Sequence, residues 1–553
     1  MNEVSFLIGG KAGFGIDKSG TVIAGILNRM GYRIYIYRDY PSLIRGGHTF
    51  SIIRASKTRV ACHLNKVDII LALNQDTFNF HKARLKEDSL IISDSDVVKI
   101  EGVSNRVIGI PITGMVKEEN AAEIMRNTCV IGALCKAAGI SWDILDEIFR
   151  KEFTKEIDIN LKIARRGFDA AREEKRIEGL GQAPLAMLTG NQAAGLGLIR
   201  GGLKTYISYP MTPSSPILHF LAEMAPDFGL KVIHPESEIG VVLMALGASY
   251  MGERVAVGTS GGGFCLMTEG LSFSGMSELP VVFIVGQRPG PSTGLPTYSA
   301  QTELHFVLNA GQGEFVRLVV APADPEEAYY WSAVSLALSQ KYQIPGIILT
   351  DKNMGEGTFN FDLSSMGEIR EEPPLLWDRK SEYKRYLDTE NGVSPLAFVP
   401  DRNAIVKVNS YEHDEYGITA EDQQITTRMN DKRLRKATYL AKDLEGYPCV
   451  KTYGNKDSST VLLCWGSNKG VCVEAAERSG LKVVQPLVLW PFPVKQFQDA
   501  LQGVKKLICV ENNATGQLTR LLKAQGFGTD KQILKYDGRP FSLDELQERL
   551  SGV

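Results

Sequence analysis

The hydrophobic positions of the chain gather in short runs that alternate with helical patterns, as in sheets whose parallel strands are joined by crossover helices. The runs that predict strands are residues 4–8, 32–37, 49–54, 205–208, 254–259, 281–286, 316–321, 346–350, 460–465, 481–484 and 507–510. Apolar residues at helical spacing predict helices at residues 21–30, 239–251 and 325–340. We therefore predict an α/β fold of several parallel-sheet domains with right-handed crossovers.

The same pattern divides the chain into four expected regions. A first block of strands and helices covers residues 1–182, and a second, which alternates strand and helix throughout, covers residues 183–355. Residues 356–458 contain a Glu-Glu-Pro-Pro stretch and an acidic patch, so we expect an irregular linker with some strand. The strand and helix pattern starts again in residues 459–553.

The composition of the chain limits which partners and which cellular compartment we expect. The chain has 553 residues, 44% of them hydrophobic, enough for roughly three or four domains. A formal net charge of −2 without a Lys/Arg-rich block argues against nucleic acid or an anionic membrane as the principal partner. No apolar leader and no apolar run of about 18 residues occurs, so we expect a cytoplasmic protein that does not span a membrane.

The eight cysteines are scattered and form no Cys-x-x-Cys pair. The closest two, Cys129 and Cys135, lie in an apolar stretch with a helical pattern. Because iron–sulfur and zinc sites need closely spaced ligands, we expect buried free thiols and no metal bound by this chain. Any redox cluster then belongs to another chain.

Four segments that carry candidate catalytic or binding residues each lie where a strand passes into a helix or loop. They are residues 209–215, which begin with Tyr-Pro-Met-Thr-Pro, residues 234–240, which begin with His-Pro-Glu-Ser-Glu, and the glycine-rich residues 258–264 and 285–294. Prolines on both sides of the first turn restrict its backbone, so Thr212 is held with its hydroxyl free. Taken alone, that turn could also be an ordinary strand-to-helix connection. Ligands bind at the carboxyl ends of parallel strands, so the four segments together predict one composite site.

The order of these segments resembles the α subunit of the 2-oxoacid:ferredoxin oxidoreductases, whose hallmark is a Tyr-Pro-Ile-Thr-Pro motif. Met211 stands here where the family has Ile. Residues 486–493 and 511–518 resemble the transketolase-like C-terminal domain of the same subunits. The first block is similar to the family's γ subunit in its glycine turn and in the Arg-Gly-Gly segment at 45–47, although Ala12 replaces one turn glycine.

The resemblance implies thiamine diphosphate as the cofactor, because the carbanion left by departing carbon dioxide needs an electron sink. The cofactor's aminopyrimidine acts as a base only when a carboxylic acid is hydrogen-bonded to its ring nitrogen in a dry setting. Glu238 is the expected acid, with Glu236 as the competing assignment. The alternative is that Glu238 is only a first-turn acid favoured by the helix dipole.

The same family binds the substrate carboxylate through a threonine and an arginine, which implies that Thr212 and Arg288 bind substrate. The residues that the resemblance assigns to the cofactor pocket are Tyr209, Pro210, Pro213, Ser260, Gly261 and Phe264. The turn of the first block, which begins a helix and so attracts anions, could hold coenzyme A or another phosphate. Its glycines are Gly9, Gly10, Gly13 and Gly15.

Thiamine enzymes hold the diphosphate through a metal at a Gly-Asp-Gly motif, and this chain has none. The resemblance therefore implies that Mg²⁺ and a 4Fe-4S cluster lie on a β subunit, that the cofactor is shared with it, and that the complex is αβ or (αβ)2. Coenzyme A would be the co-substrate and ferredoxin the electron acceptor. Residues 287–297 look most like the branch of the family that acts on 2-oxoglutarate and general 2-oxoacids.

Two other functions compete with this interpretation. A non-catalytic organiser of an electron-transfer complex could keep the fold without turnover, but the joint presence of Thr212, Glu238 and Arg288 counts against it. A dinucleotide-dependent dehydrogenase ranks last, because no acidic residue follows the first glycine turn at the ribose-binding spacing of about 20 positions. His48 and His63 have no acidic or cysteine partner at a useful spacing, so we expect structural histidines.

Overall fold

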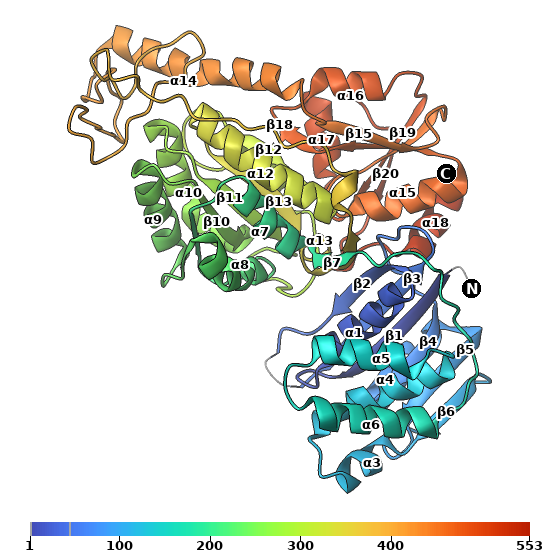
Figure 1. The fold of residues 1–553 in the computed structure, drawn as a ribbon. Helices are drawn as coiled ribbons and strands as arrows, with labels where there is room; N and C mark the ends of the chain where they lie inside the picture. Colours follow the sequence, from blue (N-terminus) through green and yellow to red (C-terminus); the bar gives the residue numbers. More distant parts are fainter. Residues whose placement is uncertain (1–2, 44–45, 553) are drawn as a thin grey trace. The chain divides into compact units, whose positions relative to one another are not determined.

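The computed structural model describes residues 3–43 and 46–552, and the chain forms two compact units (Figure 1). One comprises the described parts of Met1–Leu188, Gly357–Asp362 and Phe541–Val553, and the other comprises Thr189–Glu356 and Leu363–Pro540. Arg45 of the Arg-Gly-Gly segment lies outside the described residues. The predicted α/β class is confirmed, since both units are built on mostly parallel or mixed sheets with helices against them.

The first unit contains an eight-stranded mixed sheet with the order β6-β5-β4-β1-β3-β2-β14-β7. Its strands are β1 (Glu3–Lys11), β2 (Arg33–Asp39), β3 (His48–Ser56), β4 (Val67–Ala72), β5 (Leu85–Asp94), β6 (Arg106–Ile110), β7 (Ala186–Thr189) and β14 (Thr358–Phe361). The pairs from β6 to β1 are parallel, whereas β3 is antiparallel to both β1 and β2. β1 is buried along almost its whole length because both faces of the sheet are covered.

Helices of the first unit cover one face of this sheet (Figure 1). They are α1 (Ile16–Arg29), α4 (Arg126–Ala137), α5 (Trp142–Glu152) and α6 (Ile157–Ala170), with α2 (Gln75–His81), α3 (Ile112–Glu118) and α18 (Leu543–Ser551) completing the unit. Phe6 and Ile8 point into the core beneath the helices, while Leu7 belongs to the cluster on the opposite face. This alternation is the two-residue period of a strand.

The second unit contains a seven-stranded sheet with the order β18-β12-β13-β11-β10-β8-β9. Its strands are β8 (Thr205–Ser208), β9 (Lys231–Ile233), β10 (Val255–Ser260), β11 (Val282–Gln287), β12 (Leu318–Val320), β13 (Gly346–Asp351) and β18 (Val488–Trp490). All neighbouring pairs are parallel except β12 with β18. After β9 the chain returns across β8 to form β10, which reverses the strand order between β8 and β10.

Helices lie on both faces of this sheet. One core joins strand residues such as Tyr206 to α7 (Gly190–Arg200), α8 (Ser215–Phe228) and α12 (Pro325–Tyr342). The opposite core joins Ile207 and Val257 to α9 (Glu238–Tyr250) and α10 (Gly261–Ser277), which lie side by side in Figure 1. The short helices α11 (Leu304–Asn309) and α13 (Lys352–Glu356) follow strands β11 and β13.

A five-stranded sheet with the order β15-β17-β16-β19-β20 ends the second unit. Its strands are β15 (Val450–Gly454), β16 (Thr460–Leu463), β17 (Lys482–Pro486), β19 (Lys506–Glu511) and β20 (Lys531–Leu534), and its helices are α15 (Asn468–Ser479), α16 (Val494–Ala500) and α17 (Gln517–Ala524). β15 is antiparallel to β17, and the other pairs are parallel. Every strand predicted from the apolar runs corresponds to an observed strand, with ends that differ by a few residues.

The region from 356 to 458 differs from the expectation of an irregular linker, because Gln423–Leu444 forms the long helix α14. Its inward face consists of Met429, Lys432, Lys436 and Leu440 together with Arg433 and Leu444. This stripe has helical spacing, but charged residues occupy half of it and hide the period from a hydrophobicity pattern. The segment that precedes α14 contains few regular elements.

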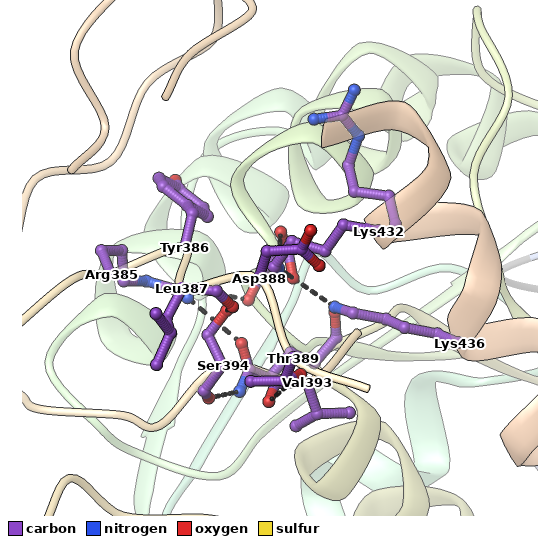
Figure 2. A network of polar contacts seen from close by, with 12 residues as sticks. Arg385, Tyr386, Leu387, Asp388, Thr389, Val393, Ser394, Lys432 and Lys436 are labelled. Atoms are coloured by element: carbon purple, nitrogen blue, oxygen red, sulfur yellow. Dashed lines mark hydrogen bonds and ion pairs between the residues drawn. The ribbon is translucent and has the colours of Figure 1, made fainter. Parts of the chain in front are cut away.

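Buried ion pairs hold α14 against the end of α10 within the second unit. Lys432 donates to both carboxylate oxygens of Glu278, at 2.8 and 2.9 Å, and Lys436 pairs with the same carboxylate. Arg385 donates to the backbone oxygens of Ser277 and Glu278 at 3.1 and 2.8 Å. Figure 2 shows both lysines coming from the same helix beside the segment that carries Arg385. The carboxylate of Glu278 therefore anchors α14, and the backbone oxygens at the same end of α10 anchor the segment that precedes it.

Candidate active site

The four segments singled out in the sequence follow four strands that are neighbours in one sheet. Strands β9, β8, β10 and β11 lie side by side and run parallel, so their carboxyl ends share one edge. Because the strand order reverses between β8 and β10, the connections that leave these two strands run in opposite directions. Open α/β sheets bind ligands in the crevice at such a reversal point. The candidate residues at this edge are Tyr209, Pro210, Thr212, Pro213, Glu238, Ser260, Gly261, Phe264 and Arg288.

The turn after β8 is held from both sides. Its Thr212–Pro213 peptide bond is cis, and the Asn191 amide donates a 2.9 Å hydrogen bond to the backbone oxygen of Pro213. Arg288, from the end of β11, donates from Nη1 to the backbone oxygen of Thr212 at 2.8 Å. The structure therefore brings together the threonine and the arginine that the sequence proposes for one ligand.

Two further contacts define the wall beside this turn. The Ser260 hydroxyl, at the end of β10, donates to the sulfur of Met211. Tyr209 is partly exposed, and its ring lies 5.9 Å from the ring of His234, centroid to centroid. The replacement of Ile by Met at position 211 thus supplies a soft hydrogen-bond acceptor for Ser260.

Glu238 begins α9, where Ser237 caps the helix by accepting a hydrogen bond from the Gly240 amide. Its side chain is 4% exposed, and its Oε1 is buried without a hydrogen-bond partner. The carboxyl lies against the first turn of α10, since a Cβ added at Gly263 would be 2.7 Å from Oε1. A buried oxygen without a partner is costly, which points to a ligand that donates or accepts there.

The competing residue Glu236 has a different environment. It lies in the loop before α9 and is exposed. A solvated carboxyl cannot provide the dry setting that the proposed chemistry requires, so the burial of the two side chains favours Glu238.

Phe264 and Gly261 belong to α10, which starts directly after Ser260. Phe264 is fully buried and makes edge contacts with Phe283 and Phe306, at centroid distances of 5.8 and 5.4 Å. Its ring therefore fixes the first turn of α10 on the sheet and contributes rigidity to the edge of the site.

A residue that sequence reasoning missed lies at the same edge. Glu303, which immediately precedes α11, is 9% exposed and touches the first residue of α10, since a Cβ at Gly261 would be 2.7 Å from its Oε1. Burial raises the pKa of its carboxyl to about 7. No local motif marked it, because its importance comes from burial beside Gly261 and Arg288, which are distant in sequence.

The glycine segment of the first unit leads from β1 into α1. A Cβ at Gly9 would approach Thr77 and His48, and a Cβ at Gly10 would approach Ile16, so packing accounts for these two glycines. Gly13 faces open space, and Gly15 has a left-handed backbone conformation at the helix start. A cavity of about 210 Å³ beside the segment is lined by residues that include Lys11, Asn74, Arg126 and Asn127.

The first unit also contains a histidine pair that the sequence did not suggest. His48 and His81 face each other with 2.8 Å between their Nε2 atoms, and burial lowers the pKa of both rings. Within residues 3–43 and 46–552, no group of three or more His, Cys, Asp or Glu side chains is arranged to hold a metal ion. The same part of the chain contains no helix with both the length and the apolar character needed to cross a membrane.

Comparisons with known proteins find relatives over the whole chain. Residues 196–432 match the family described as pyruvate flavodoxin/ferredoxin oxidoreductase, thiamine diphosphate-binding, and residues 5–170 match pyruvate ferredoxin/flavodoxin oxidoreductase. The α subunit of a 2-oxoacid:ferredoxin oxidoreductase from Saccharolobus solfataricus is 31% identical over 100% of this chain and 98% of its own length. The 2-oxoglutarate synthase subunit KorA of Archaeoglobus fulgidus is 34% identical over 42% of this chain and 68% of its own length.

A solved structure covers the whole fold. It is the 2-oxoglutarate:ferredoxin oxidoreductase of Magnetococcus marinus with 2-oxoglutarate, coenzyme A and succinyl-CoA bound. The TM-score is 0.90 and the sequence identity 29%, with 100% of this chain and 99% of that chain covered.

Proposed function

The chain belongs to the 2-oxoacid:ferredoxin oxidoreductases as an α subunit, and from this premise we propose how its own residues take part in the reaction. The enzyme uses thiamine diphosphate and coenzyme A to convert a 2-oxoacid to an acyl-CoA and carbon dioxide, and it passes the electrons to ferredoxin. Thiamine diphosphate, when bound, would supply the electron sink that departure of carbon dioxide requires.

The observation that carries the proposal is the buried, unpartnered Oε1 of Glu238 against Gly263. A carboxyl in this environment can hold a proton at a pyrimidine ring nitrogen without competition from water. The residues present therefore fit the pyrimidine end of thiamine, and Gly263 at the start of α10 lets the carboxyl pack directly against the helix backbone. In this proposal Ser260, Gly261, Tyr209, Pro210 and Pro213 form the walls, and Phe264 supports them.

We further propose that Thr212 and Arg288 orient the 2-oxoacid. The Arg288 guanidinium uses Nη1 to hold the Thr212 backbone, which leaves its remaining N–H groups for a carboxylate. Thr212 is partly exposed at the same turn. Because the guanidinium is bound to the backbone of Thr212, the arginine and the threonine hydroxyl present their donors from one turn, which favours one orientation of the substrate.

The substrate that the comparisons favour is 2-oxoglutarate. The relative from Archaeoglobus is named a 2-oxoglutarate synthase subunit, and the Magnetococcus enzyme holds 2-oxoglutarate. The resemblance of residues 287–297 to the same branch supports this choice.

The catalytic unit is proposed to require a β subunit that carries the diphosphate-bound Mg²⁺ and a 4Fe-4S cluster, in an αβ or (αβ)2 complex that reduces ferredoxin. This chain lacks a Gly-Asp-Gly motif and closely spaced cysteines. Apolar side chains on α9 and α10 are exposed next to Glu238, with Ile239 at 50%, Leu243 at 54% and Leu266 at 49%. Such a surface is typical of a protein interface, and a partner placed there would cover the acid.

In the first unit, we propose that the glycine segment with Gly9, Gly10, Gly13 and Gly15 approaches the phosphates of coenzyme A. The cavity lined by Lys11 and Arg126 at the start of α1 supports this assignment. The domain assignment is likewise a proposal, with a γ-like domain at 1–182, a pyrimidine and substrate domain at 183–355, a connecting region at 356–458 and a transketolase-like domain at 459–553. The family match to residues 5–170 supports the first of these domains.

The test is anaerobic reduction of ferredoxin or a viologen dye by this chain co-expressed with the adjacent subunit gene, with coenzyme A and a panel of 2-oxoacids. We expect thiamine-dependent turnover that is fastest with 2-oxoglutarate and that collapses in Glu238→Gln. An assembled complex that contains its cluster but turns over no 2-oxoacid would overturn the proposal in favour of an organiser role.

A further inference from the structure

A second buried carboxyl, Glu303, lies on the opposite side of the first turn of α10 from Glu238. Glu238 touches Gly263, and Glu303 touches Gly261, two residues earlier in the same turn. Glu303 is 9% exposed, and its Oε2 is buried without a hydrogen-bond partner. Nothing in the reaction as described above uses this group.

The hydrogen bonds of Glu303 connect it to the substrate end of the site. Its Oε1 accepts from the Thr302 hydroxyl at 2.8 Å, and that hydroxyl is also 3.3 Å from the backbone oxygen of Arg288. The backbone N–H of Glu303 donates to Oε1 of Gln287 at 3.2 Å. Glu303 is therefore fixed to Gln287, the last residue of β11, and to Thr302, whose hydroxyl lies beside the backbone of Arg288, the proposed substrate-binding arginine.

Glu303 and Arg288 influence the pKa values of each other. Burial raises the pKa of Glu303 to about 7, and Arg288 is the only charged group that acts in the opposite direction among the causes of this shift. Burial lowers the pKa of Arg288, and Glu303 opposes that change in turn. Two further titratable groups belong to the neighbouring helices: Glu238 on α9, which packs against Gly263 of the same turn of α10, and His305 on α11.

We propose that Glu303 is a positioning residue that sets the charge Arg288 presents to the substrate carboxylate. With Glu303 neutral, the guanidinium offers its full positive charge to the anionic 2-oxoacid. With Glu303 ionised, the carboxylate offsets this charge and adds a negative charge behind the site, so that the substrate binds more weakly. This proposal rests on the proposed function, and it makes substrate affinity dependent on one proton.

The direction of the pH dependence follows from the raised pKa. Glu303 is neutral below about pH 7 and ionises as the pH rises through that value. Substrate affinity is therefore greatest on the acid side and is lost on the alkaline side. Since an anion beside Arg288 favours the neutral form of Glu303, binding of the 2-oxoacid should also be accompanied by proton uptake near neutral pH.

The experiment measures KM and kcat for 2-oxoglutarate from about pH 6 to about pH 8 with the assembled complex. If the ionised form binds about tenfold more weakly, KM of the wild type should rise on the order of fivefold over this range. Glu303→Gln cannot ionise, so its KM should stay flat and close to the acid-side value of the wild type. Glu303→Asp keeps a titrating acid and should keep a rising KM.

The control is Glu314→Gln, which changes an exposed glutamate in the loop after α11 and should reproduce the wild-type profile. Calorimetry of 2-oxoglutarate binding in two buffers of different ionisation enthalpy gives a readout apart from turnover. It should show proton uptake in the wild type that is absent in Glu303→Gln.

The proposal is overturned if Glu303→Gln keeps the wild-type rise of KM with pH, or if the wild-type KM is itself flat. A flat wild-type KM can be observed even if the Glu303→Gln variant does not fold. A wild-type complex that shows no thiamine-dependent turnover would contradict the proposed function instead. A purely structural role would lower kcat and stability in Glu303→Gln while leaving the shape of the KM profile unchanged.

Discussion

The guanidinium of Arg288 donates a 2.8 Å hydrogen bond from Nη1 to the backbone oxygen of Thr212. The two residues come from the ends of β11 and β8, which flank β10 in the sheet, so the bond spans the middle of the site edge. It means that the proposed substrate arginine is oriented by the same turn that presents the proposed substrate hydroxyl. Their relative position is set before any ligand binds.

Arg288→Lys should raise KM for the 2-oxoacid by about 10- to 100-fold. A lysine keeps the charge but cannot bond to the Thr212 backbone and to a carboxylate with one rigid planar group. Steady-state kinetics of the assembled complex will measure the change. Arg520→Lys, at an exposed position of α17, is the control and should leave KM unchanged. A wild-type KM in Arg288→Lys would remove Arg288 from the substrate site.

Glu238→Gln should lower kcat by about 10²-fold or more, because an amide cannot hold the transferable proton. Thermal stability should not fall, since the change removes a carboxyl oxygen that is buried without a partner. Turnover and a melting curve of the same sample will measure both effects. Glu236→Gln is the matched control, two residues earlier and exposed. If Glu236→Gln loses activity while Glu238→Gln keeps it, the acid has been assigned to the wrong residue.

Gly263→Ala should impair both stability and activity, whereas Gly262→Ala should impair neither. An added Cβ at Gly263 would lie 2.1 Å from Oγ1 of Thr259 and 2.7 Å from Oε1 of Glu238. At Gly262, the nearest atom would be 3.9 Å away. Both changes improve helix propensity equally, so the difference isolates the close approach, which should cost about 1–3 kcal/mol. Urea unfolding and kcat of the two variants provide the comparison.

The sequence predicted the parts of this structure that local patterns encode. Most strands of the two sheets in the second unit follow from short apolar runs, although β9, β15, β18 and β20 were not predicted. Thr212, Glu238 and Arg288 follow from motifs at strand ends. These residues share an edge because parallel strands place their carboxyl ends together, which is a rule about topology and needs no coordinates.

What the sequence could not predict depends on contacts between distant residues. Burial against Gly261 raises the pKa of Glu303, with Arg288 opposing the shift, and nothing near Glu303 in the chain signals that burial. Helix α14 was expected to be irregular because lysines occupy its inward face, and their partner Glu278 lies more than 150 residues away in sequence. Charge normally marks a solvated face, and only the fold shows that this charge is paired.

The buried ion pair between Lys436 of α14 and Glu278 should make the free energy of unfolding depend on pH. Burial lowers the pKa of its ammonium group to about 7, with a smaller lowering effect from the neighbouring Lys432, against an ordinary value of 10.5. Above about pH 7 the unfolded chain therefore binds more protons than the folded chain, so stability should rise with pH between about 7 and 10.5. The expected gain from about pH 7 to about pH 8.5 is on the order of 1–2 kcal/mol.

Lys436→Met should flatten this rise, because it removes the group whose protonation differs between the two states. Calorimetric melting of the wild type and the variant across the same pH range will measure the difference. Lys442→Met, on the exposed face of the same helix, should keep the wild-type slope. Equal slopes in wild type and Lys436→Met would show that Lys436 remains charged in the fold and shares the Glu278 carboxylate with Lys432. Glu278→Gln should in either case destabilise the unit by about 3–5 kcal/mol, since it leaves buried cations without their counter-charge.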